Sequence, residues 1–386
     1  NRSSDLIESS ISISPAAIAD VLRIHAATPG AKPPLFLGLP GIGKTSILQQ
    51  FADDNNFDLF SFMAPHYSVP DIKGFGVPDR ERGRMTFMPS DELPWAPREG
   101  SDVYADTHGG RRPFLFLDEL TNASVPVFNL SLQLVLEHRI GLNRLCRDVF
   151  IAAAGNTAAM RTGSNKLTMS LADRFAIYNI EPNMSDIVDW MSTNGISPWV
   201  VAYLKSIAAG VGQGLWTTKA SDWNGEEPID SARSYEKLSR VLQAGFHNDD
   251  AMMVSSPLFP TVCAAHIGQK AGLAFSQFVQ MSIQVGPIED LIRAADTCAI
   301  PDSPSLRWGI AVRSIPHACS KETTFNDVIR LARRLTPESM RPSDAAKPSV
   351  FEVFVVKAAI QYNPRIATWS SVKGQLQRSA AAITKV

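Results

Sequence analysis

Apolar and polar positions along this chain alternate in a pattern that predicts strands and helices in turn. Continuous apolar runs occur at LFLGL (35–39), FLFLDEL (114–120) and DVFIAAAGN (148–156), and each ends in glycine, acidic or polar residues. Short runs of this kind are typical of strands that are buried on both faces of a sheet. Between them, TSILQQFADDN (45–55) and VFNLSLQLVLEHRI (127–140) have the apolar spacing of helices. The order predicts an α/β domain with a parallel sheet flanked by helices.

Further elements are expected on either side of this series. Residues 13–28 (ISPAAIADVLRIHAAT) have the pattern of an amphipathic helix, with Ser14 as its cap and Pro15 in the first turn. DLFSFMAP (58–65) is typical of a strand, and RFAIYNIEP (174–182) of the last strand of the domain. Helical periodicity dominates beyond that point, so we expect a domain boundary near residue 182.

Residues 65–106 are rich in proline, glycine and charge, and we expect them to form an insert in the α/β domain. Within them, GFGVPDRERGRMTFMPS (74–90) predicts a hairpin whose turn lies near Arg82 and Gly83. Long inserts in compact domains are usually functional or mobile. This segment is therefore a candidate for contact with a partner.

The charge balance argues against a general attraction to nucleic acid or to anionic membranes. The chain has 37 basic and 38 acidic side chains, and its formal net charge is -1. No apolar run approaches the roughly 20 residues that span a bilayer. The polar start, NRSSDLIESS, also lacks the apolar centre of a signal peptide. We therefore expect a cytoplasmic protein that does not enter the membrane.

The cysteines are widely spaced and form no CxxC pair, which fits a reducing compartment; they are Cys146, Cys263, Cys298 and Cys319. Cys263 and His266 lie three residues apart in CAAH, with His317 and Cys319 later in the chain. A soft metal such as zinc could be held by such residues. The other interpretation, which we prefer, is that these are core cysteines beside incidental histidines.

The segment GLPGIGKTS at residues 38–46 matches the phosphate-binding pattern GxxxxGK[ST] and lies between an expected strand and an expected helix. Glycines let backbone N–H groups wrap phosphate oxygens, and the helix adds the positive end of its dipole. We expect Lys44 to reach the β and γ phosphates of ATP and Thr45 to hold Mg²⁺. The expected nucleotide-binding residues are Gly38, Leu39, Pro40, Gly41, Ile42, Gly43, Lys44, Thr45 and Ser46.

The apolar run FLFLDE places two carboxylates, Asp118 and Glu119, at the C-terminal end of a strand, where ligands bind in parallel sheets. Asp118 is expected to hold Mg²⁺ through water. Glu119 is expected to orient and polarise the attacking water, the main chemical task left to a protein in phosphoryl transfer. Alone the pair is weak evidence, but together with the glycine loop it predicts an ATPase site.

Three later residues are further candidates, each with a plainer interpretation. Asn156 closes the strand of AAAGN and could position the lytic water, but it could equally be a turn asparagine. Arg174 in LADRF could project into the nucleotide of a neighbouring subunit, or pair with Asp173 on the surface. Arg233, in the first turn of a later helix, could contact phosphates of its own subunit or be a solvated helical arginine.

Together, the motifs GLPGIGKT, FLFLDEL, FIAAAGN, LADRF and SARSYEKL, in this order, resemble the AAA+ ATPases of the MoxR-like and dynein-related branch. The resemblance covers residues 13–250. It implies that the five stretches are the Walker A loop, the Walker B strand, sensor 1, the arginine finger and sensor 2. VPDIKGFGVPD and EHRIGLNRLCRDVFI also resemble the insert and the short hairpin of the MoxR-like branch.

The family implies a division into an α/β core at 1–182, a helical lid at 183–275 and a helical C-terminal extension at 276–386. MoxR-like proteins usually end soon after the lid, so the extension departs from the pattern. Extended forms occur among bacterial and phage-encoded ATPases. The resemblance also implies a homo-oligomer, commonly a hexameric ring, whose pore could be lined by the hairpins at 74–88 and 141–147. Each hairpin could instead be a packed connector.

Three functions remain open at this point. The first, which we prefer, is a remodelling ATPase that acts like a chaperone on a partner protein, such as one with a von Willebrand factor A domain. The second is a nucleic-acid motor or loader, because PDRERGRMTF (78–87) concentrates arginines beside apolar residues. The third is a module that binds nucleotide without hydrolysing it.

Overall fold

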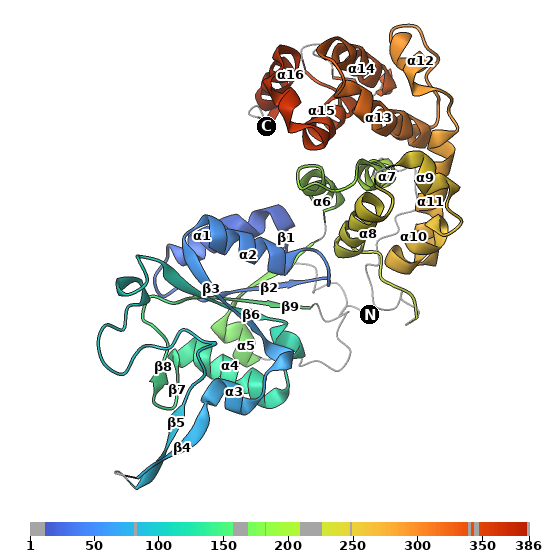
Figure 1. The fold of residues 1–386 in the computed structure, drawn as a ribbon. Coiled ribbons are helices and arrows are strands. Elements are labelled where there is room, and N and C mark those ends of the chain that lie inside the picture. Colours follow the sequence, from blue (N-terminus) through green and yellow to red (C-terminus); the bar gives the residue numbers. More distant parts are fainter. Residues whose placement is uncertain are drawn as a thin grey trace, which may run out of the picture. The chain divides into compact units, whose positions relative to one another are not determined.

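The computed structural model describes residues 12–80, 83–156, 169–181, 183–208, 226–247, 249–338, 341–342 and 347–383 (Figure 1). These residues form two compact units, the first ending at Asn183 and the second beginning at Met184.

The first unit is built on a six-stranded sheet with the order β1-β10-β2-β9-β6-β3. All neighbouring strands in it are parallel. The strands are β1 (Ser12–Ile13), β2 (Pro34–Gly38), β3 (Phe57–Met63), β6 (Arg112–Asp118), β9 (Phe150–Gly155) and β10 (Ala176–Ile180). Because β2, β9 and β6 are adjacent and parallel, their C-terminal ends meet at one edge of the sheet.

Helices cover both faces of this sheet (Figure 1). Successive residues of β2 point to opposite faces: Phe36 packs in one core with residues of α1 (Ile18–Ala26) and α2 (Lys44–Asp54). Leu35 and Leu37 pack in the other core with residues of α4 (Val125–Glu137) and α5 (Met169–Arg174). Burial on both sides explains why these strands are continuous apolar runs rather than alternating ones. The predicted α/β fold, with a P-loop and a parallel sheet flanked by helices, is confirmed.

The segment 65–106 contains helix α3 (Val69–Lys73) and an antiparallel hairpin of β4 (Phe75–Asp79) and β5 (Arg84–Met88). The hairpin extends away from the main sheet of its unit (Figure 1). Arg82, where we expected the turn, lies outside the described residues. A second hairpin pairs β7 (Arg139–Ile140) with β8 (Asn143–Arg144). Single turns of 3-10 helix connect other elements of this unit: η1 (Pro15–Ala17), η2 (Ala64–His66), η3 (Tyr104–Asp106) and η4 (Leu120–Asn122).

Among the described residues of the second unit, all regular elements are helices joined by turns and loops. Its helices are α6 (Met184–Met191), α7 (Pro198–Ala208), α8 (Ala232–Gly245), α9 (Asp250–Ser255), α10 (Phe259–Ile267), α11 (Gln269–Ile283), α12 (Ile288–Arg293), α13 (Pro304–Ala318), α14 (Glu322–Leu335), α15 (Val350–Tyr362), η8 (Pro364–Thr368) and α16 (Ser370–Ile383). One hydrophobic core runs from Ile187 to Val372. The boundary that we expected between 275 and 276 falls inside α11, and helices on both sides of it share this core. Helical periodicity identifies an apolar face but not the helix that covers it.

The N-terminal segment differs from the sequence prediction. The α-helix begins at Ile18 rather than near residue 14, because η1 precedes it, and the Ser14 side chain makes no capping hydrogen bond. Residues Ser12–Ile13 pair with β10 as a short edge strand, which two residues of sequence cannot reveal. In the part of the chain that the structure describes, no helix is both long and apolar enough to cross a membrane.

Candidate functional site

The glycine loop connects β2 to α2 at the sheet edge where the central strands end. Gly41 and Gly43 have φ angles of 77° and 89°, in the left-handed region that residues with a Cβ rarely adopt. The backbone N–H of Ile47 donates to the carbonyl oxygen of Gly43 at 2.9 Å, which is the first hydrogen bond of the helix. The N–H groups of the preceding turn have no acceptor within the helix. The loop therefore presents N–H donors and a positive helix end at one place, which suits a phosphate.

Gly38 is required because the loop folds back on the end of β2. A Cβ atom at this position would lie 2.6 Å from Cδ1 of Ile42 and 2.9 Å from Cβ of Ile180. Both neighbours are buried, so neither can move away without disturbing the core. The first glycine of the motif thus allows the loop to pack against β10.

Lys44 is the first residue of α2 and is buried, with a relative exposure of 9%. Its Nζ atom donates hydrogen bonds to the carbonyl oxygens of Gly38 and Leu39, each at 2.9 Å. These contacts hold the ammonium group inside the curve of the loop. A positive charge at this point complements the phosphates that the loop geometry favours.

Thr45 and Asp118 connect the glycine loop to the acidic strand. The Thr45 hydroxyl donates to Oδ2 of Asp118 at 2.7 Å, and the backbone N–H of Glu119 donates to Oδ1 at 2.8 Å. Asp118 is only 3% exposed. A buried carboxylate is tolerated only when its oxygens accept hydrogen bonds, and these two contacts supply them. The pair forms a compact set of hard oxygen atoms of the kind that Mg²⁺ prefers.

Glu119 occupies a strained backbone conformation at the end of β6. Its φ angle of 50° places a glutamate in the left-handed region, which costs on the order of 1–3 kcal/mol. The side chain is exposed, and Oε2 accepts a hydrogen bond from Nδ2 of Asn122 at 3.3 Å. The strain turns the Glu119 side chain out of the buried strand, while Asp118 stays within it.

Thr121 is a site residue that the sequence did not reveal. Its hydroxyl accepts a hydrogen bond from the backbone N–H of Asn156 at 3.1 Å, and the side chain is 1% exposed. A Cβ atom on Gly155 would lie 2.7 Å from the Thr121 methyl group. Thr121 therefore fixes the end of β9 against the turn that carries Glu119. A threonine after a strand is common in helix caps, so no sequence signal distinguished it.

The remaining candidates are Asn156, Arg174 and Arg233, which lie in or next to three different elements of the fold. In the sheet register Leu117 pairs with Ala153 and Leu37 pairs with Gly155, the last residue of β9, so Asn156 follows its strand at the same edge as Gly38. Arg174 ends α5, is separated from β10 by Phe175, and is partly buried. Arg233 is exposed in the first turn of α8 and belongs to the second unit. Its expected contact with phosphate thus stays a prediction.

Cys263 and His266, which we interpreted as a core cysteine beside an incidental histidine, lie on α10 in the second unit. Cys263 is fully buried, and burial raises the pKa of its thiol to about 12. Within the described ranges, no group of three or more cysteine, histidine or acidic side chains is placed to hold a metal ion.

No protein-family model matches the sequence, and no curated protein matches it. Among solved structures, it is similar to a protein of Cytophaga hutchinsonii assigned as an ATPase, with 14% identity and a TM-score of 0.33 over 60% of this chain and 76% of that one. It is also similar to a mutant of RuvB from Thermotoga maritima, with 14% identity and a TM-score of 0.35 over 72% and 74% of the two chains. These superpositions are too loose to establish a shared fold, so the fold and the site are defined by the sheet order and loop geometry above.

The first prediction concerns Thr121. Thr121→Val keeps the methyl packing against Gly155 but removes the acceptor for the Asn156 N–H, so the first unit should lose about 1–3 kcal/mol of stability. Amide hydrogen exchange measured on a peptide ending at Asn156 should accelerate by about one to two powers of ten. Thr121→Ser is the matched control, because it retains the hydroxyl, and it should exchange nearly as slowly as the native chain. Equal protection in the valine and serine variants would show that the hydroxyl has no positioning role.

Proposed function

We propose that this chain is a Mg²⁺-dependent ATPase of the AAA+ type. The observation that carries the proposal is the 2.7 Å hydrogen bond from Thr45 to Asp118, which joins the end of a glycine loop to the end of an acidic strand. Only a nucleotide with its metal ion requires both features at one point of a parallel sheet. The parallel sheet brings the two features to one edge, and the Thr45 hydroxyl and the Asp118 carboxylate are the proposed ligands of the metal ion.

The residues at the site fit Mg²⁺ and ATP. A threonine hydroxyl and a carboxylate in contact are hard oxygen ligands, and Mg²⁺ uses few protein ligands because it retains several waters. Lys44 is already held at the loop by two carbonyl oxygens, and the left-handed Gly41 and Gly43 leave space for phosphate oxygens against the backbone. When bound, ATP supplies the phosphoryl group that is transferred to water, and Mg²⁺ neutralises charge on its oxygens.

The catalytic roles follow from where the side chains lie. Lys44 stabilises negative charge on the phosphates, and Asp118 with Thr45 holds the metal ion. Glu119, exposed and turned out of the strand by its positive φ angle, accepts a proton from the attacking water and orients it. Asn156, fixed through its backbone by Thr121, places an amide group beside that water.

We further propose that the chain acts as a ring, commonly a hexamer, in which Arg174 completes the site of a neighbouring subunit. The position of Arg174 supports this role, because the residue ends α5 and lies just before the N-terminal end of β10, which is next to the edge strand β1 in the sheet order. Arg233 is proposed to contact the nucleotide of its own subunit. An isolated subunit should then hydrolyse ATP poorly.

The β4–β5 hairpin supports a protein substrate of the MoxR-like type over a nucleic acid. Its two strands carry large apolar side chains in water, with relative exposures of 64% at Phe75, 59% at Met85 and 59% at Met88. Phe75 and Met88 face each other across the strands and form one apolar surface. Exposed apolar surface of this kind is typical of protein interaction sites. We propose that this hairpin contacts a partner protein that the ring remodels, such as one with a von Willebrand factor A domain.

A nucleic-acid motor or loader is the second candidate. Arg80 and Arg84 are exposed near the turn of the same hairpin, and Lys73 lies 4.5 Å from the ring centre of Phe87. Positive groups beside aromatic rings are used to bind single-stranded nucleic acid. The near-neutral net charge and the predominance of apolar side chains on the hairpin make this the less favoured function.

The second prediction separates nucleotide binding from hydrolysis. Lys44→Ala should abolish binding of ATP, because it removes the positive charge inside the loop. Glu119→Gln should retain binding and lose turnover by about two to four powers of ten, since an amide cannot accept the proton. Binding is measured with a fluorescent ATP analogue and turnover by phosphate release. Asp53→Asn, which removes an exposed carboxylate at the far end of α2, is the control and should hydrolyse at the native rate. A native, assembled chain that releases no phosphate would instead indicate a non-enzymatic nucleotide-binding module.

The third prediction tests the placement of Arg174 across a subunit interface. Arg174→Ala should bind ATP but not hydrolyse it, because the guanidinium is needed only as charge develops in the transition state. A mixture of Arg174→Ala and Lys44→Ala subunits should regain part of the activity. At some interfaces the intact loop of an Arg174→Ala subunit then meets the intact arginine of a Lys44→Ala subunit. Phosphate release is measured over a series of mixing ratios, with assembly followed by light scattering. Mixtures that assemble normally yet stay inactive would contradict an arginine acting in trans.

The fourth prediction tests the hairpin. In the Glu119→Gln background, which should trap a bound partner, the double change Phe75→Ser and Met88→Ser should reduce capture of the partner by at least about tenfold. Ile24→Ser removes an apolar side chain that is 66% exposed on α1 and serves as the matched control. Both variants should bind ATP normally. Retention of the partner by the hairpin variant, or binding to oligothymidylate that weakens steeply with salt, would favour the nucleic-acid function.

A further inference from the structure

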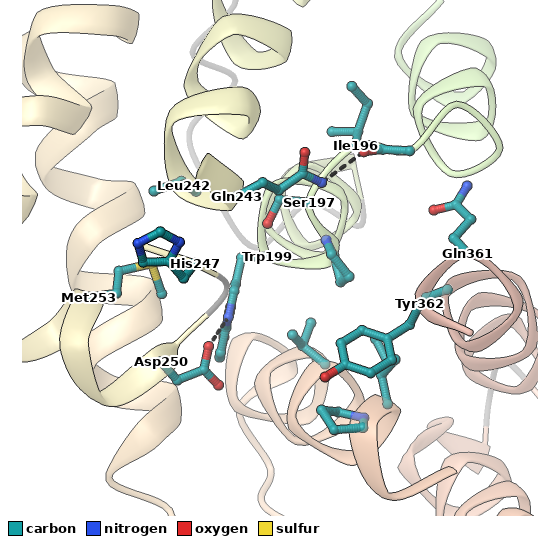
Figure 2. A pocket seen from close by; sticks show the side chains of 16 residues that line it. Ile196, Ser197, Trp199, Leu242, Gln243, His247, Asp250, Met253, Gln361 and Tyr362 are labelled. Carbon is teal, nitrogen blue, oxygen red and sulfur yellow. Dashed lines mark hydrogen bonds between the residues drawn. The ribbon is translucent and has the colours of Figure 1, made fainter. Parts of the chain in front are cut away.

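A cavity of about 410 Å³ lies within the second unit, far in sequence from the glycine loop. One side is formed by residues 195–199 with α8 and α9, and the other by α13 and α15 (Figure 2). This volume falls within the range of about 300–1,000 Å³ that is usual for small-ligand sites. Because its walls come from helices before and after residue 275, the cavity depends on the packing of both groups.

Asp250 contributes a carboxylate to the lining. Its Oδ1 atom accepts a hydrogen bond from Nε1 of Trp199 at 2.7 Å (Figure 2). Among the residues that the structure describes, no hydrogen bond is donated to Oδ2, and no basic side chain forms an ion pair with this carboxylate. Among the described residues, one of the two carboxylate oxygens of Asp250 therefore accepts no hydrogen bond, and the residue is only partly exposed.

The guanidinium of Arg313, whose charge acts on Asp250, is already hydrogen-bonded elsewhere. Arg313 lies within electrostatic range of Asp250, but its guanidinium donates to the carbonyl oxygens of Ser282 at 3.2 Å and Gly286 at 2.7 Å. Burial raises the pKa of Asp250, although the Trp199 hydrogen bond and the Arg313 charge both oppose the rise. The cost of burying this carboxylate is thus only partly compensated.

Two glutamines make the lining richer in acceptors. Nε2 of Gln243 donates to the carbonyl oxygen of Gly195 at 2.8 Å, and Nε2 of Gln361 donates to that of Ser192 at 2.6 Å. An amide placed against a carbonyl oxygen must present its NH₂ group there, since the opposite orientation would set two oxygens together. Each glutamine therefore keeps its own oxygen as an acceptor for other groups.

The walls between these polar groups are aromatic or apolar. Trp199 is 5% exposed and Met253 is 3% exposed, while Tyr362 is 56% exposed at the rim. His247 also lines the cavity and is exposed (Figure 2). A ligand with a flat apolar body could pack against these side chains while its polar end reached Asp250.

We propose that this cavity is a binding site for an organic cation, in which an amidinium, guanidinium or ammonium group pairs with Asp250 and a small apolar body fills the rest. A donor-rich cation matches a carboxylate with a free oxygen and two glutamine acceptors. Charge-assisted hydrogen bonds to a partly desolvated carboxylate are among the stronger contacts available to a small ligand. The cavity is built from residues of the second unit alone, and the proposed binding does not depend on ATP hydrolysis.

The test uses benzamidine, whose planar cation and aromatic ring match the cavity, and isothermal titration calorimetry on the full chain. Benzamidine should bind at least about tenfold more tightly than the neutral benzamide, and benzoate should not bind, because the charged hydrogen bond is lost or reversed. Equal affinity for benzamidine and benzamide, or no binding of any of the three, would overturn the proposal. This comparison needs no variant.

A matched pair of variants locates the binding. Asp250→Asn keeps the side-chain size and an acceptor for Trp199, and it should weaken benzamidine binding by at least about tenfold. Asp249→Asn removes the neighbouring exposed carboxylate, which caps α9 through the N–H of Met252 at 3.0 Å and lies outside the lining. It should change the affinity by less than about fivefold. Similar losses in both variants would reveal a general charge effect rather than a site, and would reject the proposal.

Two further ligands distinguish the sources of such a cation. Agmatine is a free small molecule with a guanidinium group, whereas acetyl-Gly-Arg-Gly-amide presents the same group on a peptide. Binding of agmatine alone, lost in Asp250→Asn, would support a site for a small metabolite. Binding of both, with the same dependence on Asp250, would support the arginine side chain of a partner protein as the ligand.

Discussion

The hydrogen bond from Thr45 to Asp118 joins two segments that are 73 residues apart in the chain, and much of the first unit is arranged to make it possible. It requires β2 and β6 to end at the same edge, although β9 lies between them in the sheet. The middle of β9 is a run of alanines, Ala152 to Ala154, which are fully buried. Small side chains there let the helices on both faces approach the sheet. The Thr45 hydroxyl and the backbone N–H of Glu119 both donate hydrogen bonds to Asp118, which offsets part of the cost of burying its carboxylate.

The same edge of the sheet contains one strained residue and two glycines with closely packed neighbours. Glu119 adopts a left-handed conformation, and Gly38 and Gly155 each occupy a position where a Cβ would collide with a buried neighbour. The left-handed conformation of Glu119 lowers stability and persists only where the surrounding structure enforces it. Here Thr121 provides that support, since it packs on Gly155 and binds the backbone of Asn156. The proposed catalytic groups are therefore held by the core before any ligand binds.

In the second unit, the proposed cation site lies among the helices that form the hydrophobic core. Its helices form a single hydrophobic core, yet one junction within it encloses a cavity with a partly desolvated carboxylate. Asp250 sits at the start of a six-residue helix, and its main support is a tryptophan of α7. A partly desolvated carboxylate with one oxygen that accepts no hydrogen bond among the described residues is costly to stability, which is why we interpret it as a site for a ligand. Its chemistry differs from that of the glycine loop, which suits an anion.

The sequence by itself determined the order of the elements in the first unit, because each strand is a short apolar run and each helix has a clear apolar spacing. It also identified the glycine loop and the acidic pair, because phosphate and magnesium chemistry demands particular residue types at fixed local spacings. Local spacing could not reveal Thr121 or Asp250. A threonine and an aspartate have many ordinary uses, and their partners, Asn156 and Trp199, lie 35 and 51 residues away. Only the tertiary structure brought these groups together, and it alone decided that helices on both sides of residue 275 share one core, because contacts between distant segments leave no periodic mark on the chain.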